Sequence, residues 1–215
     1  MYQSIGITGL LKAFGLFATL IFVVLLFLGT EWALLELLRK ASLAVTITAF
    51  MTYLVGETPL FPRLCKFPIV RSYFPPIDGV WEVTVESNWG KIKQMMSIEN
   101  CYSPSNITGL ITIKARLLSV NISFQSDSRY SSSRSVCVGI DRDKRDSVIK
   151  LNYIYENQTQ VPDITDSPTH NGAARLTIYD EKKGLTMRGT YWTDRKWTEG
   201  MNTAGTITFC RAGDA

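Results

Sequence analysis

Two segments of the sequence carry side chains that could contact a bound molecule. In an extended chain, successive side chains point to opposite faces. One face of segment 184–195 is therefore made of Leu185, Met187, Gly189, Tyr191, Thr193 and Arg195. The same alternation in segment 147–157 groups Leu151, Tyr153, Tyr155 and Asn157. Both faces change from apolar to polar along the chain, a gradient typical of a barrel interior with a packed floor and a ligand-binding mouth.

Catalytic chemistry finds no comparable support in the sequence. There is no G-x-S-x-G, no H-E-x-x-H and no glycine-rich loop that opens a helix. The single histidine, His170, has no nucleophile or paired acid identifiable beside it, so we interpret it as a hydrogen-bonding anchor of its loop. The cysteines show neither C-x-x-C spacing nor a histidine at zinc spacing. We therefore predict a protein that is not an enzyme and that binds no metal and no cofactor.

The elements that must position these residues begin with an apolar N-terminal part. Residues 10–28 hold one charge, Lys12, at their edge, and a helix of this length rises about 28 Å, close to one hydrocarbon core. Residues 38–56 form a second predicted span, in which Arg39 and Lys40 can snorkel to the interface. We predict a two-helix transmembrane hairpin over residues 1–56. A cleaved signal peptide is the alternative for the first span, but no A-x-A-like site follows it.

Charges and cysteines predict the side of the membrane on which the rest of the chain lies. Lys12 and three basic residues just after the second span outnumber the two basic residues at the end of the connection, Arg39 and Lys40, where the second span begins. The positive-inside rule then places both termini in the cytoplasm. Reduced, buried thiols are expected in that compartment, and we interpret all four cysteines in this way: Cys65, Cys101, Cys137 and Cys210.

The rest of the chain is predicted to be a linker and a β-domain. Residues 57–76 hold five of the eight prolines and form a semi-rigid linker. Residues 77–215 consist of short β-rich runs separated by turn residues. The candidate strands are 79–87, 91–101, 107–116, 118–127, 133–141, 147–156, 173–180, 184–194 and 203–211. We expect about eight antiparallel strands, because 107–127 could form one bent strand, and an all-β, up-and-down barrel that closes on itself.

The charge distribution excludes one class of partner. The chain has a net charge of +4, and the first 71 residues contain six Lys and Arg against three Asp and Glu. The β-domain is therefore nearly neutral, with no basic surface of the kind that binds nucleic acid through counterion release.

The order of several motifs resembles a known family. After the hairpin come PPIDGVWEV at 75–83, LNYIYENQ at 151–158, HNGAARLTIY at 170–179 and LTMRGTYWTDRKWTEG at 185–200. This set resembles the membrane effectors of bacterial CBASS antiphage systems, the SMODS-associating 2TM, β-strand rich effector family. The resemblance implies a cytoplasmic, lipocalin-like barrel that binds a cyclic dinucleotide made by a partner nucleotidyltransferase. It also implies that the helices then oligomerise, disrupt the inner membrane and kill the infected cell.

The implied ligand assigns roles to the two alternating faces. A cyclic dinucleotide has two phosphates, two flat bases and polar ribose edges, which require guanidinium or amide donors and aromatic faces. The predicted ligand-binding residues are Tyr153, Tyr155, Asn157, Tyr191, Thr193 and Arg195. In the structural alternative the tyrosines only fill the barrel and Arg195 pairs with a carboxylate.

A second function and one structural pair complete the predictions. A membrane-tethered carrier of a lipid or another hydrophobic ligand remains the alternative function, and it requires a cavity that is apolar up to its mouth.

In lipocalin-like barrels a Trp in a G-x-W sequence closes one end of the barrel beneath an Arg of the last strand. We interpret Trp81 and Arg211 as this structural pair.

Overall fold

The computed structural model describes residues 1–29, 33–98, 106–126, 131–143, 145–162, 164–181 and 184–212. The chain divides into two compact units. One is a helical unit of Met1–Phe74 together with Arg116–Ser119, and the other is a β-unit of Pro75–Ala115 and Val120–Ala215.

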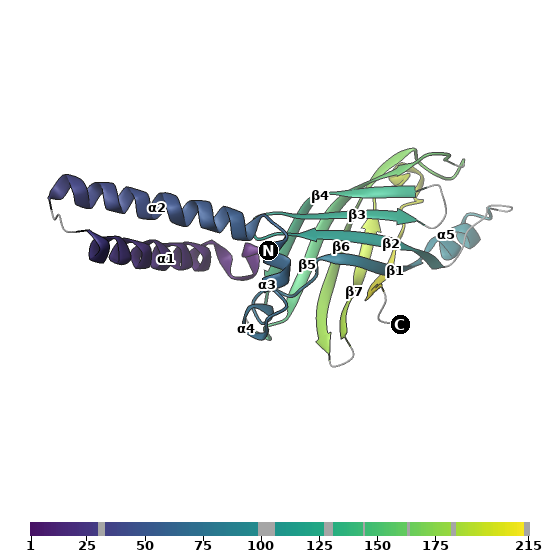
Figure 1. Ribbon diagram of the computed structural model, residues 1–215. Coiled ribbons are helices and arrows are strands. Elements are labelled where there is room, and N and C mark those ends of the chain that lie inside the picture. The colour runs from purple at the N-terminus through teal and green to yellow at the C-terminus, as the bar shows by residue number, and fades with distance from the viewer. Residues whose placement is uncertain are drawn as a thin grey trace. The chain divides into compact units, whose positions relative to one another are not determined.

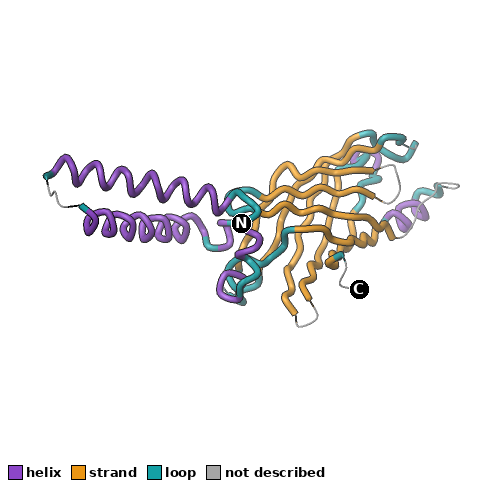
Figure 2. Tube along the Cα trace, in the orientation of Figure 1, coloured by secondary structure: helices purple, strands orange, loops and turns teal. Residues whose placement is uncertain are grey.

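The helical unit is built on two long helices. The short 3-10 helix η1 (Tyr2–Ser4) precedes α1 (Gly6–Leu28), and α2 (Leu34–Gly56) runs back along α1 (Figures 1 and 2). Both helices begin before the predicted spans. Within the described ranges, α1 is the one helix that is long and apolar enough to cross a membrane. The predicted second span does form a helix, but the composition of α2, with Glu36, Arg39 and Lys40 in its first turns, does not support a second crossing.

Short helices and one distant turn complete the helical unit. The predicted linker contains α3 (Leu60–Leu64) and α4 (Pro68–Arg71). The turn Arg116–Ser119 packs at the end of α2, where the Leu117 N–H donates to the Gly56 carbonyl at 2.8 Å. The Glu57 carboxylate accepts from the Leu118 N–H at 2.7 Å and from Ser119 Oγ at 2.8 Å. A Cβ atom on Gly56 would lie 2.9 Å from the Leu117 Cβ, so this close approach requires glycine.

The β-unit is a closed barrel of eight antiparallel strands in sequential order. The strands are β1 (Gly79–Ser87), β2 (Asn106–Ala115), β3 (Val120–Ser126), β4 (Ser131–Arg142), β5 (Ile149–Thr159), β6 (Thr169–Glu181), β7 (Gly184–Thr193) and β8 (Ala204–Arg211). Each pairs with the next, and β8 pairs with β1. The predicted up-and-down barrel is confirmed, while its likeness to lipocalins stays a prediction.

Several sequence predictions are wrong in detail. Residues 91–98 of the predicted strand 91–101 form no strand, because α5 (Trp89–Met95) occupies the first five of them, and residues 99–101 lie outside the described residues. Trp89 and Ile92, three residues apart, share one face of this helix and are both buried, so burial favours the helix. Segment 107–127 is not one bent strand, since the turn that begins at Arg116 separates β2 from β3. The expected burial of the cysteines holds for Cys65 only: Cys137 and Cys210 are exposed, and Cys101 lies outside the described residues.

One end of the barrel is filled with apolar side chains. The fully buried side chains at this end include Trp81, Ile113, Leu151, Leu176, Met187 and Phe209. The Trp81 Nε1 donates to the Ile77 carbonyl at 2.9 Å, and the Arg211 guanidinium carbon lies 4.7 Å from the indole ring centre. Arg211 also donates to the carbonyls of Pro76 and Asp78. The predicted contact between Trp81 and Arg211 is therefore confirmed.

Candidate ligand-binding site

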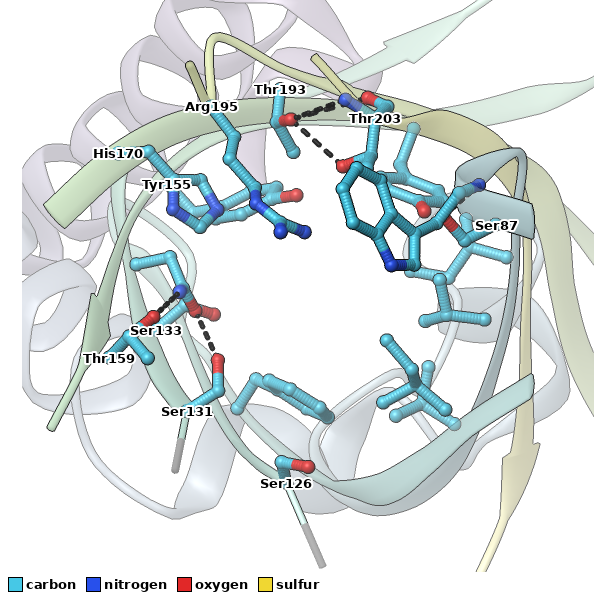
Figure 3. Close-up of a pocket in the computed structure, with 18 of the residues that line it drawn as sticks. Ser87, Ser126, Ser131, Ser133, Tyr155, Thr159, His170, Thr193, Arg195 and Thr203 are labelled. Carbon is cyan, nitrogen blue, oxygen red and sulfur yellow. Dashed lines mark hydrogen bonds between the residues drawn. The ribbon is translucent and has the colours of Figure 1, made fainter. Parts of the chain in front are cut away.

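The barrel encloses a cavity of about 460 Å³ above this apolar layer. Its lower wall is mainly apolar, with Val83, Ile111, Phe124 and Ile207. Its upper wall is rich in hydroxyl groups, and Figure 3 shows Ser87, Ser126, Ser131, Ser133, Thr159 and Thr203 around the opening. This volume and this combination of apolar walls with a few directed polar groups are those of small-molecule sites.

Strand β5 brings three of the predicted residues into the cavity. Tyr153, Tyr155 and Asn157 all line it, as the alternation predicts. The two tyrosine ring centres are 5.7 Å apart. Burial raises the pKa of both tyrosine hydroxyls far above the usual value, so both remain neutral hydrogen-bonding groups at physiological pH. Asn157 is positioned by its neighbours, since its Oδ1 accepts from Ser131 Oγ at 2.7 Å.

Strand β7 and the residues after it supply the other three predicted ligand-binding residues. Tyr191, Thr193 and Arg195 line the same cavity. Thr193 Oγ1 lies 3.0 Å from Thr203 Oγ1, a pair drawn in Figure 3. Burial, the dominant influence, raises the pKa of Tyr191. All six predicted residues are thus gathered around one cavity, and their contact with a ligand stays a prediction.

Arg195 is the cationic group of this site. Its guanidinium extends into the cavity in Figure 3, and its side chain is 15% exposed. Its Nη2 donates to the Thr165 carbonyl at 2.7 Å, and its Nε forms an ion pair with Asp166 Oδ1 at 2.9 Å. The carboxylate partner of the structural alternative therefore exists, but it does not remove the guanidinium from the cavity. The guanidinium carbon also lies 4.5 Å from the ring centre of Trp89, within cation–π range.

Sequence reasoning missed three side chains of this wall. Trp89 falls between the predicted strands 79–87 and 91–101, and Asp166 lies in the loop before β6, where no periodicity marks it. His170 lies on β6, whereas the sequence predicts a hydrogen-bonding anchor of a loop. The alternation of side chains along β6 could have placed the His170 side chain inside the barrel. Ala174 and Leu176, which share its face of the strand, are both buried there. Among the described residues, the buried Nδ1 of His170 has no hydrogen-bond partner.

In the part of the chain that the structure describes, no group of three or more His, Cys, Asp or Glu side chains has an arrangement that could hold a metal ion. The site instead offers one guanidinium, aromatic rings, an amide and several hydroxyls around an opening. Such a set can bind a flat, polar, anionic molecule through charge-assisted hydrogen bonds and stacking.

Comparison with known proteins identifies the β-unit. Residues 72–211 match the family described as Cap15, cyclic dinucleotide receptor domain. The whole chain is also similar to a protein of Escherichia albertii named CD-NTase-associated protein 15. The two are 26% identical over 191 residues, which cover 88% of this chain and 89% of the relative. The resemblance to the CBASS effectors is thereby confirmed, and the chain belongs to the Cap15 cyclic dinucleotide receptor family.

Proposed function

We propose that this protein is a CBASS effector that binds a cyclic dinucleotide in the barrel cavity and responds by disrupting the inner membrane. The observation that carries the proposal is the position of Arg195, whose guanidinium extends into the polar mouth of the barrel inside the region that matches the family. A partner nucleotidyltransferase would supply the ligand.

The cavity walls match the chemistry of such a ligand. Arg195 presents a fork of N–H donors, which suits a phosphate oxygen pair. Tyr153, Tyr155 and Trp89 offer ring surfaces for the bases. Asn157 and Thr193 carry the amide and hydroxyl groups that can contact base or ribose edges. The apolar lower wall excludes water beneath the ligand, which strengthens each of these contacts.

The cavity also distinguishes this function from its alternative. A carrier of lipids or other hydrophobic ligands requires a wall that is apolar up to the mouth. Here the mouth contains an ion pair, a histidine and at least six hydroxyl groups. Placing an alkyl chain there would desolvate these polar groups without replacing their hydrogen bonds, at a cost of about 1–3 kcal/mol for each group.

The membrane response is the second part of the proposal. We propose that α1 and α2 together occupy the inner membrane with the barrel in the cytoplasm, and that copies of these helices associate when ligand binds. The apolar composition of α1, with no side chain buried in the unit, supports an environment of lipid for it. Ligand can shift the protein toward an assembled state only if it binds that state more tightly.

The test is calorimetric titration of the full chain in detergent with a panel of cyclic dinucleotides, alongside fatty acids. We expect at least one cyclic dinucleotide to bind and fatty acids not to bind. The Arg195→Ala variant should lose this binding while its melting temperature stays near that of the wild type. Arg188→Ala is the matched control, because Arg188 lies on β7 and is exposed. Binding of fatty acids alone would overturn the proposal in favour of the carrier.

A second measurement tests the membrane response. The full chain is reconstituted into vesicles that hold a fluorescent dye, and the cyclic dinucleotide that binds best is added. We expect dye release together with a larger assembly in crosslinking. Binding without release and without assembly would contradict this part of the proposal and leave the binding function standing.

A further inference from the structure

Among the described residues of the cavity wall, the Nδ1 atom of His170 is buried with neither a hydrogen bond nor an ion pair. His170 lies opposite Asn157 in the ladder between β5 and β6, and Figure 3 shows its ring near Tyr155 and Arg195 at the cavity. Its Nδ1 is buried, and the described residues offer it no hydrogen bond. Buried polar atoms in native proteins almost always have a partner. An unpartnered nitrogen in the wall of a binding cavity is therefore available to pair with a group of the ligand that fills the cavity.

The charges of the cavity point to the nature of this partner. The side chains that line it include one cation, Arg195, and one anion, Asp166, which already pair with each other. A cyclic dinucleotide would add two negative phosphate charges to this neutral wall. Buried charges are costly unless they are paired. Of the lining side chains, His170 is the one whose ordinary pKa allows it to gain a positive charge near neutral pH.

We propose that His170 is the second phosphate-binding residue of the cavity and that it takes up a proton when the ligand binds. Arg195 then contacts one phosphate and the imidazolium of His170 contacts the other. This inference rests on the proposed function and adds to it a pH dependence of binding.

The surroundings of His170 keep the imidazole neutral before ligand arrives. Burial lowers the pKa of His170, and Arg195 lowers it further, while Asp166 and Asp194 oppose the shift. These groups come from the loop before β6 and from the residues after β7, and neutral Tyr155 lines the same cavity from β5. A phosphate at hydrogen-bond distance from the ring would favour its charged form and raise the pKa of His170.

The difference between the pKa of His170 in the free protein and in the complex determines whether binding strengthens or weakens as pH rises. Between the pKa of the free protein, which is below 6.5, and the higher pKa of the complex, the complex holds one proton more than the free protein. Binding therefore weakens as pH rises through this window, by up to about tenfold per pH unit. Below the window both states are protonated, and the slope disappears.

The experiment is calorimetric titration of the full chain in detergent, purified without a histidine tag, with the tightest-binding cyclic dinucleotide. Titrations at several pH values between 5.5 and 8.5, each in two buffers of different ionisation enthalpy, give the affinity and the number of protons taken up. For the wild type we expect uptake approaching one proton per ligand and an affinity that falls as pH rises. For His170→Gln we expect no uptake and an affinity that does not depend on pH and that equals or lies below that of the wild type at high pH.

A second measurement needs no substitution. Because His170 is the only histidine of the chain, its two ring C–H protons give one set of imidazole resonances, whose chemical shifts follow its protonation and report its pKa. We expect this pKa to rise when ligand binds. Ligand binding with no proton uptake and an unchanged His170 pKa would overturn the inference while leaving the proposed function intact. Absence of binding by any cyclic dinucleotide at every pH would reject both.

Discussion

Among the residues of the barrel that the structure describes, two contacts join an arginine to a tryptophan, and only one of them lies at the cavity. Arg211 lies 4.7 Å from the ring centre of Trp81, and Arg195 lies 4.5 Å from that of Trp89. The distances are nearly equal. Arg211, however, donates to two backbone carbonyls beside a tryptophan that is 0% exposed, whereas Arg195 extends into a cavity. The contact distance alone therefore does not show whether such a pair supports the fold or binds a ligand.

The secondary-structure elements that carry the two Arg–Trp pairs explain why one pair supports the fold and the other lines a cavity. Trp81 is on β1, which pairs with β2 on one side and β8 on the other, and Arg211 ends β8. The first pair is thus fixed by closure of the barrel. Trp89 lies on a helix of seven residues, and Arg195 follows the end of β7. Side chains on such connecting segments are more easily moved, and binding residues are concentrated there.

The largest expected effect concerns the pair at the closed end. Trp81→Ala should lower the free energy of unfolding of the barrel by about 3–5 kcal/mol, because a fully buried ring is replaced by a cavity. Denaturant unfolding of the full chain in detergent measures this change. Trp197→Ala is the control, since Trp197 is 70% exposed and its loss should cost little. Equal losses for the two variants would contradict a structural role specific to Trp81.

The next effect tests the geometry of the cavity pair. Arg195→Lys keeps the charge but loses the planar fork, so the affinity for a cyclic dinucleotide should fall about 10- to 100-fold. The melting temperature without ligand should stay within a few degrees of the wild type. Calorimetric titration measures the affinity. If lysine binds the ligand as well as arginine does, a point charge is sufficient and the fork has no role.

A smaller effect is expected for the arginine of the closed end. Arg211→Met removes the cation above Trp81 and two hydrogen bonds but keeps an unbranched apolar chain. We expect a loss of about 1–2 kcal/mol in the free energy of unfolding. Ligand affinity should not change, and a parallel titration checks this. A loss of affinity without a loss of stability would show that the two pairs are not separate in function.

The smallest effect concerns the acid beside Arg195. Asp166→Asn removes a negative charge that would repel a phosphate and that competes for the guanidinium. We expect the affinity for a cyclic dinucleotide to rise about two- to threefold, since an ion pair of this exposure contributes less than about 1 kcal/mol. Asp143→Asn, which removes the ion pair with Lys150, is the control and should leave the affinity unchanged. A weaker affinity for Asp166→Asn would instead make Asp166 a positioning residue for Arg195.

The two pairs also show how far sequence reasoning reaches. Strand alternation places Tyr153, Asn157 and Thr193 inside the barrel because each strand has two faces and one of them is buried. Strand alternation does not predict the positions of Trp89 and Asp166, since neither lies on a strand. Their positions depend on how α5 and the loop before β6 fold over the open end. That packing joins residues far apart in the sequence, and no local pattern contains it.

Helix composition similarly limits what the sequence can predict about the two N-terminal helices. The apolar run from Gly6 to Leu28 predicts a helix because length and hydropathy agree. In α2 these two signals disagree: the helix is as long as α1, but charges occupy its first turns. Local sequence therefore predicts that both helices form, but it does not decide the environment of the second one.

The turn at Arg116–Ser119 has a practical consequence for protein engineering. It is the connection between β2 and β3, yet it belongs to the helical unit, which is thus discontinuous in the sequence. A chimera joined only at Phe74 would combine the helices of one relative with the turn of another. Glu57 would then face backbone and hydroxyl groups for which it was not selected. Exchange of sensors between relatives should therefore transfer residues 116–119 together with the helices, as a second segment of the same module.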